Sequence, residues 1–223
     1  MTSPDRPLVV GFDLDMTLID TRPGFADTLR ALGDELGVDL PVEQMTERLG
    51  PPLDVLLAPH LPAELVAPAG DRFRALYPDL AVAGVPVLPG AHEALAAVRR
   101  HGGRILVVTG KYAPNAQRHL DHLGLDVDHL EGWVWGALKA QPLRDEGAAV
   151  YVGDHVHDVE GARAAGVVSV SVLTGGCEEA ELREAGTDVV LPDLRGFPDW
   201  LDAFVADPAG RTESGARVVP ADG

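Results

Sequence analysis

The sequence predicts an α/β fold in which a parallel sheet is covered by helices on both faces and is interrupted by a helical insert. Short, valine-rich apolar runs alternate with stretches of helical spacing, which is typical of parallel sheets. Between about Asp20 and Val87 no strand-like run occurs, and apolar residues recur there at helical spacing instead. The 223 residues, 46% of them hydrophobic, fit one large domain or a domain with a modest insert.

Five apolar runs have the length and composition of buried strands, and the first of them ends at Asp13. The predicted strands cover residues 8–12, 104–109, 148–152, 167–172 and 188–191. The predicted helices between them cover residues 91–100, 115–123, 159–165 and 178–185.

The insert follows the first strand, with a helix that we expect to begin near Thr21 and Pro23 and to stop at Gly37. The C-terminal stretch is rich in Pro, Gly, Ala and charge without periodicity, which indicates a flexible tail. The expected organisation is an α/β core at residues 1–19 and 88–206, a helical insert at 20–87 and a tail at 207–223.

Composition and charge narrow the function classes. With 18 basic and 35 acidic residues the net charge is −17, which repels nucleic acid and anionic lipid surfaces. The single cysteine, Cys177, allows no internal disulfide and no cysteine-based zinc site. No leader-like N-terminus and no apolar run of about 18 residues is seen. We therefore expect a cytoplasmic protein that binds neither nucleic acid nor membrane.

Acidic residues lie where two predicted strands end, and ligands of parallel sheets bind at that edge. Asp13 and Asp15 follow the first strand, and Asp154 and Asp158 follow a later one. Like charges this close need a shared cation, and hard oxygen ligands favour Mg²⁺. The sequence therefore predicts a magnesium site built from both acidic pairs.

The same edge offers the groups that phosphoryl transfer requires. A carboxylate can attack phosphorus to form an aspartyl phosphate, and its neighbour can act as general acid and base. Thr109 can supply a hydroxyl and backbone N–H groups to the phosphate. Lys139 can supply a compact positive charge, with Lys111 as its competitor, because these two are the only lysines in the chain.

With these motifs in order, the chain resembles the haloacid dehalogenase-like hydrolases, specifically the phosphatase branch of the phosphoglycolate phosphatase type. The resemblance spans about Val9 to Leu201. It implies a doubly wound, Rossmann-like core with an inserted helical cap. The four motifs appear as Asp13-Leu14-Asp15-Met16-Thr17, Thr109, Lys139, and Gly153-Asp154 with Asp158.

The resemblance also implies roles for these residues. Asp13 would be the nucleophile and Asp15 the general acid and base. Mg²⁺ would be held by the Asp13 side chain, the Asp15 backbone carbonyl and Asp154, with Asp158 as a further ligand or a neighbour. Thr109 and Gly110 would bind phosphate oxygens together with Lys139. The implied substrate is a small phosphorylated metabolite, and the protein would be a monomer or a homodimer.

Two departures from the family pattern stand out. Met16 occupies a position where many relatives carry glycine. The interval from Lys139 to Asp154 is shorter than in many relatives, so only residues 140–147 can form the connecting helix.

Other residues receive weaker assignments. In capped relatives a loop like the one around Arg48 and Gly50 faces the site, so both are candidates for substrate contact. His155 and His157 are interpreted as solvent-facing residues or as neighbours of the site. Trp133 and Trp135 alternate as in a strand and are interpreted as core or sheet-edge aromatics. Cys177 is interpreted as an unreactive small residue, because no basic neighbour would lower its pKa.

Four alternatives remain at this point. Haloacid dehalogenation would need neither Asp15 nor an acidic fourth motif, and a degenerate binding protein would show decayed motifs. A phosphomutase would use the same aspartyl phosphate with a different acceptor. A receiver-like phosphoaspartate switch belongs to a different class, but such modules lack a helical insert.

Overall fold

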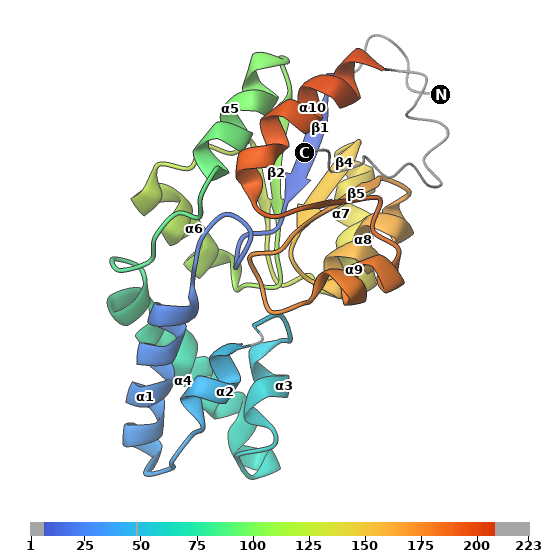
Figure 1. The fold of residues 1–223 in the computed structure, drawn as a ribbon. Helices are drawn as coiled ribbons and strands as arrows, with labels where there is room; N and C mark the ends of the chain where they lie inside the picture. The colour runs from blue at the N-terminus through green and yellow to red at the C-terminus, as the bar shows by residue number, and fades with distance from the viewer. Residues whose placement is uncertain (1–6, 48, 208–223) are drawn as a thin grey trace.

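The computed structural model describes residues 7–47 and 49–207. Six strands form one sheet in the order β3-β2-β1-β4-β5-β6, and every neighbouring pair is parallel. The α/β Rossmann-like fold expected from the sequence is therefore confirmed (Figure 1). The strands are β1 (Val9–Phe12), β2 (Arg104–Val108), β3 (His129–Glu131), β4 (Val150–Gly153), β5 (Val168–Val172) and β6 (Val189–Leu191).

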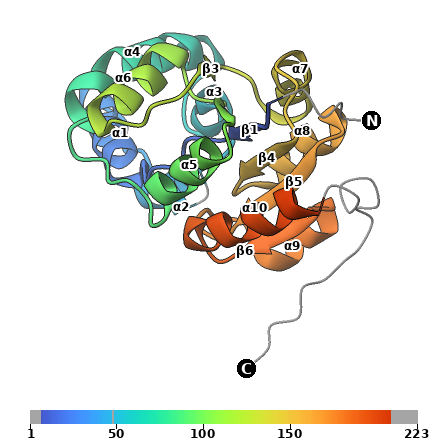
Figure 2. The same ribbon diagram turned by 90° about the horizontal axis from the view of Figure 1, so that it is seen from above.

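Helices cover both faces of the sheet (Figure 2). On one face α5 and α10 pack against the larger core cluster, to which α6 also contributes. On the other face α7 and α8 pack against a smaller cluster around Leu106 and Tyr151. The helices are α5 (Ala91–Arg100), α6 (Ala113–Leu123), α7 (Ala140–Asp145), α8 (Val156–Ala165), α9 (Glu179–Ala185) and α10 (Phe197–Ala206), with short 3₁₀ turns at Gly136–Lys139 and Leu194–Gly196.

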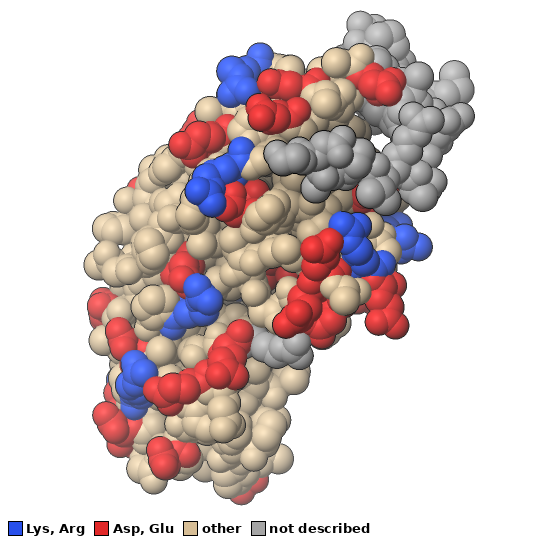
Figure 3. All heavy atoms as spheres, viewed as in Figure 1, with Lys and Arg blue, Asp and Glu red and all other residues tan. Residues whose placement is uncertain are grey.

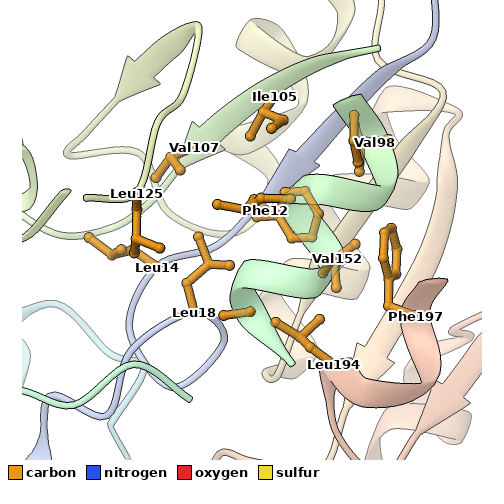
Figure 4. Close-up of a cluster of buried hydrophobic side chains, with 14 of the residues drawn as sticks. Phe12, Leu14, Leu18, Val98, Ile105, Val107, Leu125, Val152, Leu194 and Phe197 are labelled. Carbon is orange, nitrogen blue, oxygen red and sulfur yellow. The ribbon is translucent and has the colours of Figure 1, made fainter. Parts of the chain in front are cut away.

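The larger core joins side chains from neighbouring strands to the helices above them (Figure 4). Phe12 of β1 meets Phe197 of α10 edge to face, with ring centroids 5.4 Å apart. Ile105, Val107 and Val152 complete the layer and are fully buried. Burying an apolar side chain of this size contributes roughly 1.5–3 kcal/mol, so this layer fixes the strand that ends at Asp13.

The segment between β1 and α5 is helical, as the apolar spacing predicts. Its helices are α1 (Arg22–Leu36), α2 (Val42–Glu47), α3 (Leu53–Leu57) and α4 (Ala63–Ala81). They bury a cluster of their own, in which the rings of Phe25, Phe73 and Tyr77 pack in succession at tilted angles. Figure 1 shows this group at one end of the molecule, beside the carboxyl ends of the strands.

Helix α1 shows why its ends could be read from the sequence. Thr21 is its N-cap residue, a proline lies in its first turn, and Gly37 closes it in the left-handed conformation at φ 66°. Glycine adopts that conformation at no steric cost. The predicted start and stop of this helix are both confirmed.

Two interpretations fail or fall outside the described residues. Trp133 and Trp135 do not belong to a strand, because β3 ends at Glu131, and Trp133 is 61% exposed. Their interpretation as core or sheet-edge aromatics is therefore wrong, because the two tryptophans alternate along a loop and not along a strand. The flexible tail predicted at 207–223 lies, apart from its first residue, outside the described part of the chain, as does Arg48.

The surface agrees with the acidic composition. On the face shown in Figure 3, Asp and Glu side chains are spread over the α/β part and the helical insert, and Lys and Arg form no continuous patch. Within the described residues, no helix combines the length and the apolar character needed to cross a membrane.

Candidate active site

The candidate site lies where the order of the sheet reverses. Strand β1 lies between β2 and β4. Outward from β1, the sheet continues through β2 and β3 on one side and through β4, β5 and β6 on the other. Such a switch point leaves a crevice beyond the carboxyl ends of the strands. Asp13 follows β1, Thr109 follows β2 and Asp154 follows β4. All three line one cavity of about 240 Å³.

Three buried carboxylates converge in this crevice. Asp13, Asp154 and Asp158 each offer an oxygen, and these atoms all lie within 4.8 Å of one another. Asp13 Oδ1 is buried and accepts no hydrogen bond from protein. The Lys139 ammonium lies 3.3 Å from this oxygen, and one cation does not balance three buried carboxylates, so a second cation is needed to offset their burial. This donor set therefore fits a hard divalent cation such as Mg²⁺.

The pKa values of Asp13 and Asp154 reflect the same burial and repulsion between carboxylates. Burial raises the pKa of Asp13 to about 7, and the Asp158 and Asp15 carboxylates add to the rise while Lys139 opposes it. Burial and the Asp158 and Asp13 carboxylates also raise the pKa of Asp154 well above its usual value. Both carboxyl groups thus resist ionisation until a cation is near.

Lys139 lies on the Asp13 side of the site. Its Nζ lies 2.6 Å from Asp158 Oδ1 and 3.3 Å from Asp13 Oδ1, and it donates to the Tyr151 hydroxyl at 3.0 Å. Burial lowers the pKa of Lys139, but the two carboxylates outweigh it and keep the ammonium charged. The short interval before Asp154 is accommodated, because the 3₁₀ turn ending at Lys139 leads directly into the six-residue helix α7.

Lys111 lies on the other side of the same crevice. Its Nζ contacts Asp15 Oδ1 at 2.9 Å and the Tyr77 hydroxyl of α4 at 2.8 Å. Burial raises the pKa of Asp15, but the Lys111 ammonium outweighs it, so the pKa lies below the usual value. The two lysines are therefore both in the site, one beside each aspartate of the first motif, rather than alternatives for one position.

Asp158 organises the loop that carries Asp154. Its Oδ2 accepts hydrogen bonds from the backbone N–H groups of Asp154 at 3.2 Å and His155 at 3.0 Å, which caps α8. A Cβ at Gly153 would lie 2.3 Å from the Asp158 carboxyl carbon, so only glycine permits this approach. The other oxygen of Asp158 accepts from Lys139. Asp158 therefore mainly positions Lys139 and the loop that carries Asp154.

The remaining predicted residues also have defined places. Thr109 Oγ1 accepts from the Lys111 N–H at 3.3 Å, and Gly110 lines the cavity. Gly50 O accepts from Trp135 Nε1 at 2.9 Å, and a Cβ at Gly50 would lie 2.6 Å from the His155 ring. Gly50 thus anchors the helical insert to the α/β part. His155 and His157 are partly buried, stack at 4.7 Å and line the same cavity.

Met16 adopts the left-handed conformation at φ 61°. Glycine enters this region freely, whereas a methionine in it is strained. The turn thus has a backbone conformation that glycine would adopt without strain, and Met16 adopts it at a steric cost. The Thr174 hydroxyl donates to the Met16 carbonyl at 2.6 Å and helps to fix this turn.

Several residues of the site were missed by the sequence reasoning. Thr17 Oγ1 donates to Asp154 Oδ1 at 2.8 Å and links the first motif to the fourth. Gly175 lies so close to Asp154 that any side chain there would collide with its carboxylate. Tyr77 reaches the site from α4. Thr17 lies inside the first motif and could have been noted, but Tyr77 and Gly175 carry no local signal.

A buried acidic cluster at the switch point of a parallel sheet defines a class of α/β proteins with a candidate cation site there, and comparison with known proteins identifies the family. Residues 8–166 match the family model of the haloacid dehalogenase-like hydrolases. The chain belongs to this family.

Individual relatives agree with this assignment. The chain is 32% identical over 221 residues to a phosphoglycolate phosphatase of Rhodospirillum rubrum, covering 87% of this chain and 91% of that protein. It is also 31% identical over 189 residues to the tyrosine-protein kinase PtkA of Mycobacterium tuberculosis, covering 77% of this chain and 64% of that one. The crystal structure of a predicted phosphatase from Clostridium acetobutylicum shares the fold, with a TM-score of 0.78 at 20% identity over 88% of this chain and 98% of that one.

Proposed function

We propose that the protein is a Mg²⁺-dependent phosphatase that hydrolyses a small phosphate monoester through an aspartyl phosphate on Asp13. The observation that carries the proposal is the convergence of carboxylate oxygens from Asp13, Asp154 and Asp158, which lie within 4.8 Å of one another in a buried site. The phosphatase names of relatives that match most of the chain support the same activity.

Asp13 is the proposed nucleophile because it directly follows β1 at the switch point and lines the cavity, whereas Asp158 is held by Lys139 and by two backbone N–H groups. One of its oxygens would attack phosphorus while the ester oxygen leaves on the opposite side. Lys139, 3.3 Å from Asp13 Oδ1, would steady the nucleophile and attract the phosphate oxygens. A bound Mg²⁺, held by Asp13, Asp154 and the Asp15 backbone carbonyl, would supply charge neutralisation for the phosphate oxygens.

Asp15 is proposed to deliver the proton to the departing alcohol. Lys111 holds this carboxyl group ionised at 2.9 Å when no substrate is present. A phosphate dianion entering beside it would raise its pKa, because a like charge disfavours ionisation. After the alcohol leaves, the same carboxylate would take a proton from the water that hydrolyses the aspartyl phosphate.

The helical insert α1–α4 is proposed to act as a cap that closes the cavity. Tyr77 contacts Lys111, and Gly50 accepts from Trp135, so two separate points of the insert touch the α/β part. Closing a cap excludes water from the reacting groups and strengthens their electrostatic interactions. Thr109, Gly110 and Gly50 would line the closed site, and Arg48 is retained as a proposed substrate contact although it lies outside the described residues.

The experiment that tests the proposal is steady-state release of p-nitrophenol from p-nitrophenyl phosphate. We expect continuous turnover with Mg²⁺, loss of turnover on adding EDTA, and recovery when Mg²⁺ is restored in excess. Turnover that persists in EDTA would contradict the metal assignment. Stoichiometric labelling of the protein by a phosphoryl donor, without continued release of phosphate, would instead favour a phosphoaspartate switch.

The raised pKa of Asp13 predicts a pH-dependent stability that requires no substrate. Between the unfolded value of 3.8 and about 7, the folded protein holds a proton on Asp13 that the unfolded chain has released. Stability contributed by this group therefore falls as pH rises through that window, by up to about 1.4 kcal/mol per pH unit. Mg²⁺ binds the ionised form, so it should reverse the trend.

The measurement is urea unfolding in EDTA at pH 5 and pH 7.5 for the parent and for Asp13→Asn. The parent should lose more stability than the variant over this interval, and in separate samples without EDTA Mg²⁺ should stabilise the parent more strongly at pH 7.5 than at pH 5. Identical slopes for the two proteins would contradict the assigned pKa of Asp13.

A further inference from the structure

The part of the cavity lining that comes from the helical insert includes a group of apolar and aromatic side chains. Phe25 and Phe73, from α1 and α4, line the cavity with ring centroids 4.9 Å apart. Leu53 and Leu56 of α3 line the same cavity. Apolar side chains give no hydrogen bond to a charged group, and they favour burial of an apolar one.

Cations that could receive a second negative charge are already paired among the described residues lining the cavity. Arg74 contacts Asp54 at 3.0 Å and Asp71 at 3.1 Å. Lys111 and Lys139 are engaged by the aspartates described above. A carboxylate on the substrate would have to compete with these partners and would meet a net acidic surface. With Lys139 proposed for the phosphate and Lys111 held by Asp15, Arg74 is the remaining lysine or arginine among the described lining residues, and its two acidic partners disfavour a second anionic group on the substrate.

Trp133 lines the cavity in an unusual conformation. Its φ is 62°, a region in which a bulky residue is strained, and its side chain is 61% exposed. The Trp133 N–H donates to the Lys111 carbonyl at 2.9 Å, so the loop of the second motif fixes its backbone. Its ring packs on Tyr112 at 5.1 Å, and the Arg74 guanidinium lies 5.3 Å from its centroid. A large aromatic surface is therefore held beside the site and stays more than half exposed, although Tyr112 and Arg74 lie against the ring.

We propose that the substrate's alcohol carries a flat apolar group, such as an aromatic ring, and no carboxylate, and that Trp133 and Tyr112 hold that group against the apolar side chains of the insert. Trp133 is then a specificity-determining residue. This assignment rests on the proposed phosphatase activity, and it selects a class of phosphate monoester other than phosphoglycolate.

The test compares kcat/KM for 2-phenylethyl phosphate, ethyl phosphate and phosphoglycolate with Mg²⁺ present. The first two differ by one phenyl ring and have the same type of primary alcohol as leaving group. We expect 2-phenylethyl phosphate to exceed ethyl phosphate by about tenfold or more, and to exceed phosphoglycolate as well. A ratio near one between the first two esters, or a preference for phosphoglycolate, would overturn the proposal while leaving the phosphatase activity intact.

Variants assign the preference to the aromatic surface. Trp133→Gly removes the ring and relieves the φ of 62°, so loss of folding should not obscure the result. We expect it to lower the preference for 2-phenylethyl over ethyl phosphate by about fivefold or more, whereas Trp133→Phe should keep most of it. Leu80→Ala, a change at an exposed residue of α4, should leave the ratio unaltered.

Two further outcomes are informative. An unaltered ratio in Trp133→Gly would overturn the assignment to this residue. A phosphoglycolate preference that disappears in Arg48→Ala would show that a carboxylate is recognised after all and would also overturn the proposal. Absence of phosphate release from all three esters, and from p-nitrophenyl phosphate, would refute the proposed function itself.

Discussion

Asp13→Asn is expected to abolish turnover, with kcat falling by at least about 10⁴-fold. The amide has nearly the same shape as the carboxylate but cannot attack phosphorus to give a stable acyl phosphate. It also withdraws one charged ligand from the proposed Mg²⁺ site. Both effects act on the chemical step, so kcat must fall. A change in KM alone would contradict the prediction.

The fold should survive this substitution. The Asp13 carboxyl is destabilised by burial and by its acidic neighbours, and its removal leaves Lys139 paired with Asp158 at 2.6 Å. The metal-free variant should therefore unfold at no lower urea concentration than the parent at pH 7.5. Asp20→Asn is a matched control, because Asp20 lies seven residues further along the same chain segment and pairs with Arg22 outside the cavity. A variant Asp13→Asn that turned over at the parent rate would sink the mechanism.

Lys139→Met is expected to lower kcat by about 10²- to 10³-fold, the usual consequence of removing one preorganised charge from a transition state. Methionine keeps most of the volume of the lysine stem, so it leaves no large cavity in a position that is only 2% exposed. The variant should be assayed beside Lys111→Met, its matched counterpart. Lys111 contacts Asp15 rather than Asp13, so its removal should cost less in kcat.

Stability must be measured with activity for this pair. Lys139→Met leaves Asp13 and Asp158 buried without their cation, and breaking a buried pair on one side costs about 3–5 kcal/mol. Saturating Mg²⁺ should restore part of that loss. Near-normal turnover in a folded Lys139→Met protein would refute the role given to Lys139. A larger loss in Lys111→Met than in Lys139→Met would transfer that role to Lys111.

Tyr77 connects the helical insert to the core on the Asp15 side of the site. The contact of the Tyr77 hydroxyl with Lys111 joins α4 to the Asp15 side of the site at 2.8 Å. The His119 ring lies against the same hydroxyl at 3.1 Å, and burial together with Lys111 lowers the pKa of His119 to about 4. A neutral His119 thus adds no charge to the Lys111–Asp15 pair at neutral pH.

The sequence alone determined the sheet, the helical character of the insert and the aspartates at the strand ends. Buried strands such as Val9–Phe12 are short, continuous and apolar, and their periodicity is a local property of the chain. Helix α1 carried its own start and stop in Pro23 and Gly37. Asp13 and Asp154 could be placed at one edge because parallel strands end on the same side of a sheet.

Tertiary structure decided the pairing of the charged groups and the character of the cavity. The sequence does not distinguish the roles of Lys111 and Lys139. Only the packing of their loops places Lys111 beside Asp15 and Lys139 beside Asp13. Alternation made Trp133 resemble a strand residue, whereas the backbone after Glu131 turns into the left-handed region and exposes its ring. Contacts between residues far apart in the chain depend on the packing of whole elements, and no local pattern encodes them.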